Sequence, residues 1–509
     1  MSFKSFTLFT LLLSAHLSAQ QFTNPVIPGD FPDPTIIRVG EKYYASGTSS
    51  DWSPQYPIFE SVDLINWKQI SSAFKVKPEW TKSSFWAPEF YVLNGKIFLY
   101  YTARRASDNI SFIGVASTDD IKKGFTDHGC LVPFGREAID AFVFEDNGKH
   151  YITWKAYGLD ERPIELLCQE LSPDGIKLVG EPFTLLKDDE GIGMEGQYIY
   201  RKGDYYYIIY SIRDCCSPRS DYAVSVARSK SFKGPYEKYA GNPILEGDGD
   251  IVQSCGHGTA VETPDGRMFY LFHAYMKGIR FSNGRQGFLK EMAINDEKWP
   301  YFVTGKYALV NEPIPFANTR QADFSVFEDR FEGTELRPEW TWNSPSYDVR
   351  IKIENNTLFL SGTQKNNNNN GTIIGLRTLT PDYEFMTEIK DQKGIISGLT
   401  LNGGGNSLII FGKKDGNIIL TQTGRNDEKI LYQKSEAGNI HVKITVSDVK
   451  NLSFQWSRDK KNWNPIQFET ENNNVSGILQ LNRASRPGLI HIGAENIPAE
   501  FTYFNLYYR

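Results

Sequence analysis

A glycine followed by an aromatic or apolar run recurs at nearly constant spacing through the first part of the chain. Successive glycines are 55, 53, 55 and 63 residues apart, and each begins a run such as GKIFLYYT or GDYYYIIYS. These runs have the composition of β-strands, and turn residues separate them. Repeats of roughly 40 to 50 residues, each built from several short strands, are typical of the blades of a β-propeller. The repeat therefore predicts an all-β, five-bladed propeller with the marker glycines Gly40, Gly95, Gly148, Gly203 and Gly266.

Five residues with useful chemistry occupy one position of this repeat, seven to nine residues before the marker glycine. In a propeller the first strand of each blade lines the central channel, so residues at one position of the repeat converge on the axis. Three acids, a tryptophan and a histidine that meet in one funnel make a candidate active site. The five residues are Asp33, Trp86, Asp140, Glu195 and His257.

The sequence around the three acids favours a chemical role for them. Asp33 lies between two prolines in GDFPDPTIIR, and prolines restrict the backbone. Asp140 and Glu195 lie in apolar strand sequence, where an unpaired charge would be costly. Cleavage of a glycosidic bond needs an acid that protonates the leaving oxygen and a carboxylate on the opposite face of the sugar. The three acids therefore suit glycoside hydrolysis.

The second part of the chain is rich in short strands but lacks the glycine repeat. The stretch 311–323, NEPIPFANTRQAD, has no periodicity and is the predicted linker. Runs after it, such as TLFLSG, SLIIFGKK and IHVKITVS, predict an antiparallel β-sandwich. We therefore divide the mature chain into a propeller (22–318) and a sandwich (319–509). Because prolines stiffen the short linker, we expect the sandwich to pack on the propeller and to shape the rim of its pocket.

The N-terminal segment 1–20, MSFKSFTLFTLLLSAHLSAQ, has the features of a secretory signal peptide. A lysine precedes an apolar run, and small residues precede a plausible cut near Gln20. The run is too short to span a membrane, and no other segment is long and apolar enough to do so. We therefore expect a secreted or periplasmic protein without membrane insertion.

Composition favours a neutral carbohydrate as the substrate. The formal net charge of −6 offers no basic surface for nucleic acid. Aromatic residues make up 14% of the chain and supply flat apolar faces on which sugar rings stack. Five cysteines do not form a disulfide framework in so long a chain, and no CxxC spacing indicates zinc. The neighbours Cys215 and Cys216 form either a vicinal bridge or two partly buried thiols.

The first domain resembles glycoside hydrolase family 43 in a series of segments that follow the family's order. They are NPVIPGDFPDP, PIFESVDLINW, FWAPEF, AIDAFVFED, MEGQYIY, SCGHGTAV, and GRQGFL followed by WPYF. The resemblance implies a five-bladed propeller and an inverting mechanism. It implies Asp33 as general base, Glu195 as general acid, and Asp140 as the acid that orients Glu195 and raises its proton affinity. A nearby carboxylate has this effect because it disfavours ionisation.

The same resemblance implies roles for residues beside the acids. Trp86 would wall the pocket next to the sugar, unless it is ordinary packing. Arg285 in NGRQG would contact the substrate, unless it is a surface charge. His257 would face either the substrate pocket or, through water, a central cation, often calcium; no cofactor is otherwise required. The C-terminal part, with FEDRFEGTELRPEWTW and PAEFTYFNLYYR, resembles the concanavalin-like sandwich found behind many family members.

The leading hypothesis is an inverting exo-glycosidase that removes a terminal pentose from plant cell-wall glycans or their oligosaccharides. We expect α-L-arabinofuranose before β-D-xylose, because the run TSSDWSPQYPIFESVDL departs from the usual β-xylosidase pattern. An endo-arabinanase, or an exo-enzyme of the galactan type, would use the same three acids. A sugar-binding propeller without turnover is the third alternative, but a binding module has no need of all three acids.

Overall fold

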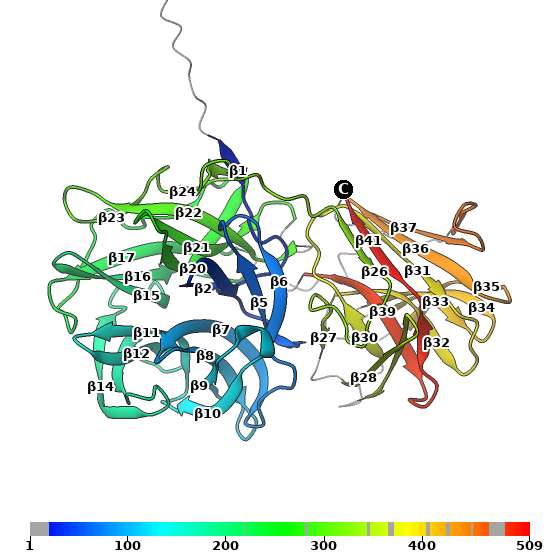
Figure 1. Ribbon diagram of the computed structural model, residues 1–509, viewed down its shortest axis with the longest axis horizontal. Coiled ribbons are helices and arrows are strands. Elements are labelled where there is room, and N and C mark those ends of the chain that lie inside the picture. Colours follow the sequence, from blue (N-terminus) through cyan, green and yellow to red (C-terminus); the bar gives the residue numbers. More distant parts are fainter. Residues whose placement is uncertain are drawn as a thin grey trace, which may run out of the picture.

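The structure, a computed structural model, is built from β-strands, which confirms the prediction of an all-β chain. Figure 1 shows two bodies, one formed by the N-terminal strands and one by the C-terminal strands. No helix in the described part of the chain is long and apolar enough to cross a membrane. Apart from Gln20, the predicted signal peptide lies outside the described residues. These residues are 20–217, 219–279, 283–343, 347–364, 371–403, 408–423, 428–448, 451–467 and 484–509.

Within these ranges, five four-stranded antiparallel sheets form most of the N-terminal body (Figure 1). Strands that follow one another in the chain are neighbours in each sheet, because short turns join them; only β4 is left out of the first sheet. The sheets are β2 (Thr35–Val39), β3 (Lys42–Ser46), β5 (Gln55–Ser61) and β6 (Lys68–Phe74); β7 (Thr81–Leu93), β8 (Lys96–Arg105), β9 (Ser111–Thr118) and β10 (Thr126–Val132); β11 (Ala138–Asp146), β12 (Lys149–Ala156), β13 (Glu165–Leu171) and β14 (Leu178–Lys187); β15 (Glu195–Lys202), β16 (Tyr205–Ile212), β17 (Ala223–Ser229) and β18 (Glu237–Lys238); β20 (Val252–Glu262), β21 (Met268–Met276), β22 (Gln286–Ile294) and β23 (Pro300–Phe302).

The marker glycines of the sequence repeat occupy one structural position. Each lies in the tight turn between the first and the second strand of its sheet, with φ between +60° and +83°. Residues with a side chain rarely adopt this conformation, so glycine is the favoured residue there. The glycine repeat in the sequence therefore arises from the hairpin turn between the first two strands of each sheet.

The first strands of the five sheets contact one another in a closed ring. The strand β2 contacts β7 and β20, β11 contacts β7 and β15, and β15 contacts β20. In Figure 1 these strands surround the middle of the N-terminal body. Residues at the start of each first strand are therefore brought together, although they lie far apart in the chain.

The ends of the N-terminal body are tied together by short strands. The strand β1 (Gln21–Thr23) pairs with β25 (Asn311–Pro313), and β19 (Glu246–Gly247) pairs with β24 (Tyr307–Ala308). The first residues of the predicted linker (311–323) thus form a strand, because β1 offers them a backbone partner. No sequence signal predicts the pairing of β1 with β25, because these short segments lie at opposite ends of the body in the chain.

The C-terminal body contains two six-stranded antiparallel sheets, which confirms the predicted sandwich. Apolar side chains from both sheets form one core, in which Phe411 and Phe454 meet at a ring distance of 5.5 Å. One sheet consists of β26 (Val326–Asp329), β41 (Phe504–Tyr508), β31 (Tyr383–Ile389), β36 (Ile440–Ser447), β37 (Asn451–Ser457) and β38 (Asn464–Pro465). The other consists of β30 (Thr372–Gly375), β39 (Arg486–Gly493), β32 (Ile395–Asn402), β33 (Leu408–Lys414), β34 (Asn417–Thr423) and β35 (Glu428–Ser435). A smaller sheet contains β28 (Tyr347–Glu354), β29 (Thr357–Gln364) and β40 (Ala499–Phe501).

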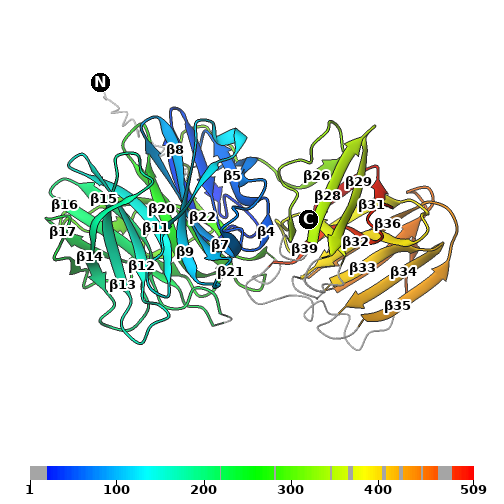
Figure 2. The same cartoon turned by 90° about the horizontal axis from the view of Figure 1, so that it is seen from below.

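The sandwich packs directly on the N-terminal body, as the stiff linker predicted (Figure 2). The strand β4 (Trp52–Ser53) of the first body pairs with β27 (Trp342–Asn343) of the second. Beside this pair, the guanidinium of Arg486 lies over the ring of Trp52 at 4.2 Å. Backbone pairing and a buried cationic contact both require a fixed geometry, so the two bodies form a defined interface.

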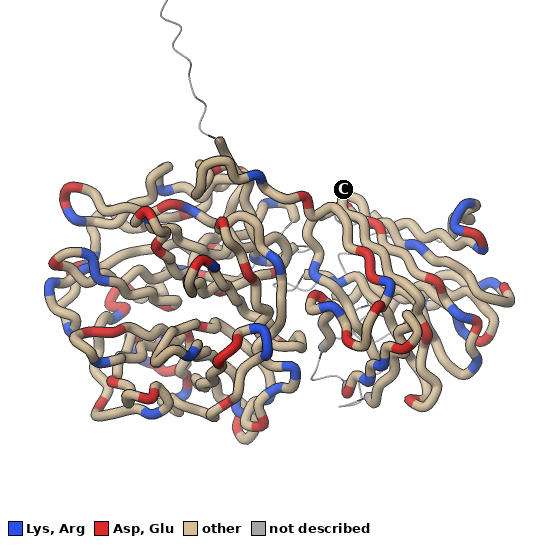
Figure 3. The backbone as a smooth tube through the Cα atoms, viewed as in Figure 1, with Lys and Arg blue, Asp and Glu red and all other residues tan. Residues whose placement is uncertain are grey.

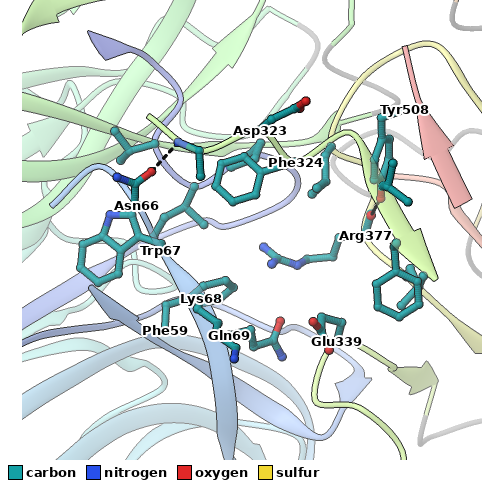
Figure 4. A pocket seen from close by; sticks show the side chains of 18 of the residues that line it. Phe59, Asn66, Trp67, Lys68, Gln69, Asp323, Phe324, Glu339, Arg377 and Tyr508 are labelled. Atoms are coloured by element: carbon teal, nitrogen blue, oxygen red, sulfur yellow. Dashed lines mark hydrogen bonds between the residues drawn. The ribbon is translucent and has the colours of Figure 1, made fainter. Parts of the chain in front are cut away.

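A cavity of about 430 Å³ lies between the two bodies (Figure 4). Phe59 and Trp67 line it from the first body, and Phe324, Arg377 and Tyr508 line it from the second. The Arg377 side chain points into this cavity in Figure 4. None of the residues of the sequence-predicted site lines it. Figure 3 shows positive and negative residues interspersed along both bodies, in accord with the absence of a basic stripe in the sequence.

Candidate active site

Four of the five residues that share one position of the sequence repeat meet at the middle of the ring formed by the first strands of the sheets. The Nδ1 atom of His257 lies 3.6 Å from Asp33 Oδ1 and 3.8 Å from Asp140 Oδ2. The backbone N–H of Gly196, next to Glu195, donates a hydrogen bond of 3.1 Å to Asp140 Oδ2. The three acids and the histidine therefore form one cluster, as the shared position in the repeat predicted.

Irregular backbone aims these side chains at the centre. The pairing of β7, β11, β15 and β20 with their neighbours shifts register at or beside the site residue. Asp33, Asp140 and His257 have positive φ values of 51°, 58° and 41°. Such conformations cost about 1–3 kcal/mol for a residue with a side chain and concentrate at functional sites. The backbone is thus shaped for the cluster rather than for regular pairing.

Asp33 is held as an ionised carboxylate. Its Oδ1 lies 3.0 Å from Arg285 Nη1, and its Oδ2 accepts a 2.6 Å hydrogen bond from Thr48 Oγ1. Burial acts to raise the pKa of Asp33, but Arg285, His273 and His257 outweigh it and hold that pKa well below its usual range. The structure therefore supplies a carboxylate that can only accept a proton at neutral pH.

His273 supports Asp33 as a neutral ring. Its Nδ1 lies 3.0 Å from the backbone nitrogen of Asp33 and 3.3 Å from Asp33 Oδ1. Burial is the main reason that the pKa of His273 falls to about 4. The ring stacks on Tyr222 with centroids 5.6 Å apart. Through this stack, His273 links the surroundings of Asp33 to those of Glu195.

Glu195 is paired with a lysine that sequence reasoning did not find. The Nζ atom of Lys155 donates to Glu195 Oε2 at 3.0 Å, and the hydroxyl of Tyr222 donates to Oε1 at 2.9 Å. Burial acts to raise the pKa of Glu195, but Lys155 outweighs it and holds that pKa below its ordinary value. Lys155 also lies 3.6 Å from a second carboxylate, that of Glu137.

Asp140 has a raised pKa and titrates together with Glu195. Burial is the largest cause, and together with the charge of Glu195 it raises the pKa of Asp140 to about 7, although His257 opposes the rise. The sequence predicted that Asp140 raises the proton affinity of Glu195. Because the two carboxyl groups titrate as an interacting pair beside Lys155, this role stays a prediction.

Arg285 and Trp86 lie at the edges of this cluster. Arg285 is buried against Asp33, so the alternative of a surface charge is wrong; its contact with substrate stays a prediction. Its Nη1 also lies 3.6 Å from the sulfur of Cys216, which is bonded to Cys215 in a vicinal disulfide.

Trp86 is half-buried, with the guanidinium of Arg104 over its ring at 5.5 Å. Its role as a pocket wall stays a prediction.

The predicted calcium is not matched by a set of ligands. In the part of the chain that the structure describes, no three His, Cys, Asp or Glu side chains are arranged to hold a metal ion. His257 directs Nδ1 at two carboxylates, and its ring packs on Gly196, where a Cβ would lie 2.7 Å from the ring. A water-separated calcium stays a prediction, and no step below depends on it.

The missed residues reach the site from second strands and loops. Lys155 is a charge within the apolar strand sequence TWKAY, a signal that the same reasoning used for Asp140. Tyr222 precedes β17, and His273 lies in the aromatic run of β21; both segments look like ordinary core sequence. Only the pairing of strands shows that these side chains meet Glu195 and Asp33.

Comparison with known proteins agrees with this site. A family model described as glycosyl hydrolases family 43 matches residues 22–300, and a model of a β-xylosidase C-terminal concanavalin A-like domain matches residues 328–483. A β-xylosidase of Bacillus subtilis is 27% identical over 366 residues, which cover 66% of each chain. A non-reducing end α-L-arabinofuranosidase of Bacteroides ovatus is 26% identical over 75% of this chain and 74% of its own length. The chain spans about two thirds of the length of the first curated relatives that it matches.

Solved structures share the arrangement of both bodies. A GH43 protein from Bacillus licheniformis has a TM-score of 0.80 and 21% identity, covering 96% of this chain and 100% of its own. A xylan β-1,4-xylosidase from Bacillus halodurans has a TM-score of 0.80 and 20% identity, covering 95% of this chain and 99% of its own. At a sequence identity of 20–21%, the similarity of these structures to the chain establishes the two-body fold alone.

Proposed function

The chain belongs to the glycosyl hydrolases of family 43, and we propose that it is an inverting exo-glycosidase that removes terminal pentose residues. The proposed substrates are plant cell-wall glycans, or their oligosaccharides, that end in α-L-arabinofuranosyl or β-D-xylosyl residues. The names of the relatives, which include β-xylosidases and α-L-arabinofuranosidases, support this range. The proposed reaction uses no cofactor.

One observation carries the proposal: the site holds its carboxyl groups in opposite protonation states. Arg285 keeps Asp33 ionised, whereas Asp140 and Glu195 together retain a proton near neutral pH. Glycoside hydrolysis needs one group of each kind, because water must be deprotonated while the leaving oxygen is protonated.

In the proposed reaction Asp33 takes a proton from water as the water oxygen bonds to the anomeric carbon. Glu195 gives a proton to the glycosidic oxygen as the bond between that oxygen and the anomeric carbon breaks. Attack opposite the leaving group gives a free pentose of inverted configuration, and it requires the two carboxyl groups to lie about 6.5 to 9.5 Å apart. Asp33 then releases its proton to solvent, and solvent returns one proton to the Asp140–Glu195 pair.

Glu195 has to gain its proton before this step. We propose that the proton passes from Asp140 while Lys155 turns from Glu195 toward Glu137, which already lies 3.6 Å from the lysine. The positive charge then remains compensated throughout the change, which favours such a movement in a buried site.

The fold and location that go with this function are also proposals. We propose that the five sheets are the blades of a five-bladed propeller (22–318), followed by the sandwich domain (319–509). The five four-stranded sheets and the ring of contacts between their first strands support it. The sequence of residues 1–20 supports export to the periplasm or the medium.

The direct test is hydrolysis of aryl α-L-arabinofuranoside and aryl β-D-xylopyranoside side by side, with Asp33→Ala as the inactive control. Proton NMR of the first product should show inverted configuration at the anomeric carbon. Release of oligosaccharides from linear arabinan would favour the endo-arabinanase instead, and activity on galactan alone would favour the galactan-type enzyme. Binding of sugar without any hydrolysis would favour the non-catalytic module.

A further inference from the structure

We infer that two arginines of the sandwich, Arg377 and Arg486, are positioning residues for the proposed base Asp33 in the other body. They act through Asp30, a half-buried carboxylate three residues before Asp33 that holds the turn carrying Arg285. This inference rests on the proposed role of Asp33, and it assigns the second domain a part in the chemistry of the first.

Asp30 binds the backbone of Arg285, and Asp33 binds its guanidinium. The carboxylate of Asp30 accepts a 3.3 Å hydrogen bond from the backbone N–H of Arg285, while Asp33 binds the guanidinium at 3.0 Å. The backbone N–H of Phe31, between the two acids, donates to the carbonyl of Arg285 at 2.5 Å. Arg285, which lies just before β22, therefore cannot shift without breaking contacts to the loop that carries Asp33.

The carboxylate of Asp30 also packs directly against the turn before Arg285. A Cβ at Gly284, where φ is +68°, would lie 2.3 Å from Asp30 Oδ1. The backbone of the turn and the carboxylate are thus in close contact, and a displacement of Asp30 would move the turn.

Asp30 is compensated by charges from both bodies. Burial raises the pKa of Asp30, and the groups that oppose this rise are Arg285, Arg486 and Arg377. Arg377 Nη1 lies 3.5 Å from the carbonyl oxygen of Asp30, and its guanidinium lies over the ring of Phe59 at 4.8 Å. Two of the three positive charges that oppose this rise therefore come from the sandwich.

Arg486 is fixed in a buried position by its other contacts. Its side chain donates to Thr341 Oγ1 at 2.8 Å and covers the ring of Trp52. Burial lowers the pKa of Arg486 to about 9, and the charge of Asp30 opposes this fall. Arg486 is thus a fixed positive charge at the interface, and its charge and that of Asp30 favour each other.

The backbone next to Arg377 packs between the two catalytic loops. The carbonyl of Thr378 accepts a 3.3 Å hydrogen bond from Asn283 Nδ2, just before Arg285. A Cβ at Gly29, just before Asp30, would lie 2.8 Å from the same carbonyl oxygen. The segment 377–379 thus contacts the loop of Asp33 and the turn of Arg285 at once.

The test uses the full chain with Arg377→Gln and Arg486→Gln. Loss of either positive charge favours protonation of Asp30 and loosens Arg285, so the pKa of Asp33 should rise. The groups that face Asp33 are Arg285, His273, His257 and Asp140, and only the first is displaced. We expect the acidic limb of kcat/KM against pH to move up by about one unit, which is about tenfold in activity below that limb.

The matched control is Arg350→Gln, an exposed arginine of the same domain whose partner is Glu495. It should keep the wild-type pH profile and melting temperature. Arg377→Lys, which preserves the charge, should restore most of the acidic limb. Asp30→Asn should shift the limb by itself, and adding Arg486→Gln to it should change little more, because both act through one contact.

The result that overturns the inference is a folded Arg486→Gln or Arg377→Gln variant with the wild-type acidic limb. A crystal structure of the double variant gives a readout that does not depend on activity. We expect the guanidinium of Arg285 to leave Asp33, and an unchanged separation near 3.0 Å overturns the inference even if no pentoside is hydrolysed. Inactivity of the wild-type protein on every pentoside would instead contradict the proposed function.

Discussion

At the scale of single residues, the two proposed catalytic carboxylates differ in the cation that each one meets. Arg285 lies against Asp33, and its backbone contacts with Asp30 and Phe31 hold it in place. Lys155 lies between Glu195 and Glu137, so it has two partners within reach. A fixed cation suits a group that stays ionised, and a cation with a second partner suits a group that must gain and lose a proton.

Lys155→Met is expected to shift the alkaline limb of the pH profile upward. Lys155 holds the pKa of Glu195 below its ordinary value, so its removal raises that pKa. A general acid with a higher pKa stays protonated to higher pH, and the limb should rise by about one unit or more. The measurement is kcat/KM against pH with a pentoside that has a poor leaving group.

Lys149→Met is the control, because Lys149 lies on the same strand, β12, but is paired with Glu170 at the surface. Its profile should equal that of the wild type. An alkaline limb that stays in place, or moves to lower pH, in Lys155→Met would show that the lysine does not set the proton affinity of Glu195.

At the scale of elements, the loop between β16 and β17 connects the two halves of the site. It carries the disulfide Cys215–Cys216, whose second sulfur contacts Arg285, and it ends at Tyr222, which donates to Glu195. One short segment thus touches the partner of the proposed base and the proposed acid. The disulfide confirms one of the two alternatives that the sequence left open.

Replacing the disulfide by Cys215→Ser and Cys216→Ser is expected to raise KM several-fold. The bridge fixes two side chains at the edge of the site, and without it the contact with Arg285 is lost. The melting temperature should change little, because the bridge closes no long loop. Steady-state kinetics and thermal melting check this, with the free cysteine Cys130→Ser as control. Kinetics equal to those of the control would contradict it.

The sequence predicted the strands that belong to the repeat. It did not predict single pairings between short strands that lie far apart in the chain. The hairpin glycines lie at one position of each sheet, so their spacing placed Asp33, Asp140, Glu195 and His257 together. The pairing of β4 with β27 has no such signal, because each strand has two residues and the partners lie far apart. Lys155, Tyr222 and His273 were missed for the same reason: their contacts depend on which strands become neighbours.

At the scale of the whole molecule, the sandwich completes the surroundings of the N-terminal body. Trp52 and Phe59 of the first body are buried beneath arginines of the second, and Gln69 donates to the carbonyl of Pro338 at 2.6 Å. These contacts join the bodies beside the loop of Asp30 and Asp33. Removal of the sandwich therefore affects both stability and the site.

A chain ending at residue 318 is expected to fold poorly and to lose activity. It exposes Trp52 and Phe59 to water and leaves Asp30 with Arg285 as the one remaining cation of its three. We expect a melting temperature lower by at least about 5 °C and a large loss of kcat/KM. Thermal melting and kinetics of the truncated and full chains check this, and equal values in both would contradict the coupling of the two bodies.

The dependence of activity on the leaving group shows whether Asp33 is the base and Glu195 the acid. Wild type, Asp33→Ala and Glu195→Ala are assayed on pentosides of one sugar with good and poor leaving groups. We predict that Asp33→Ala abolishes turnover of all of them, because every substrate needs an activated water. Glu195→Ala should retain most activity on the best leaving groups, which depart without a proton. Equal losses by Glu195→Ala on every leaving group would contradict the account.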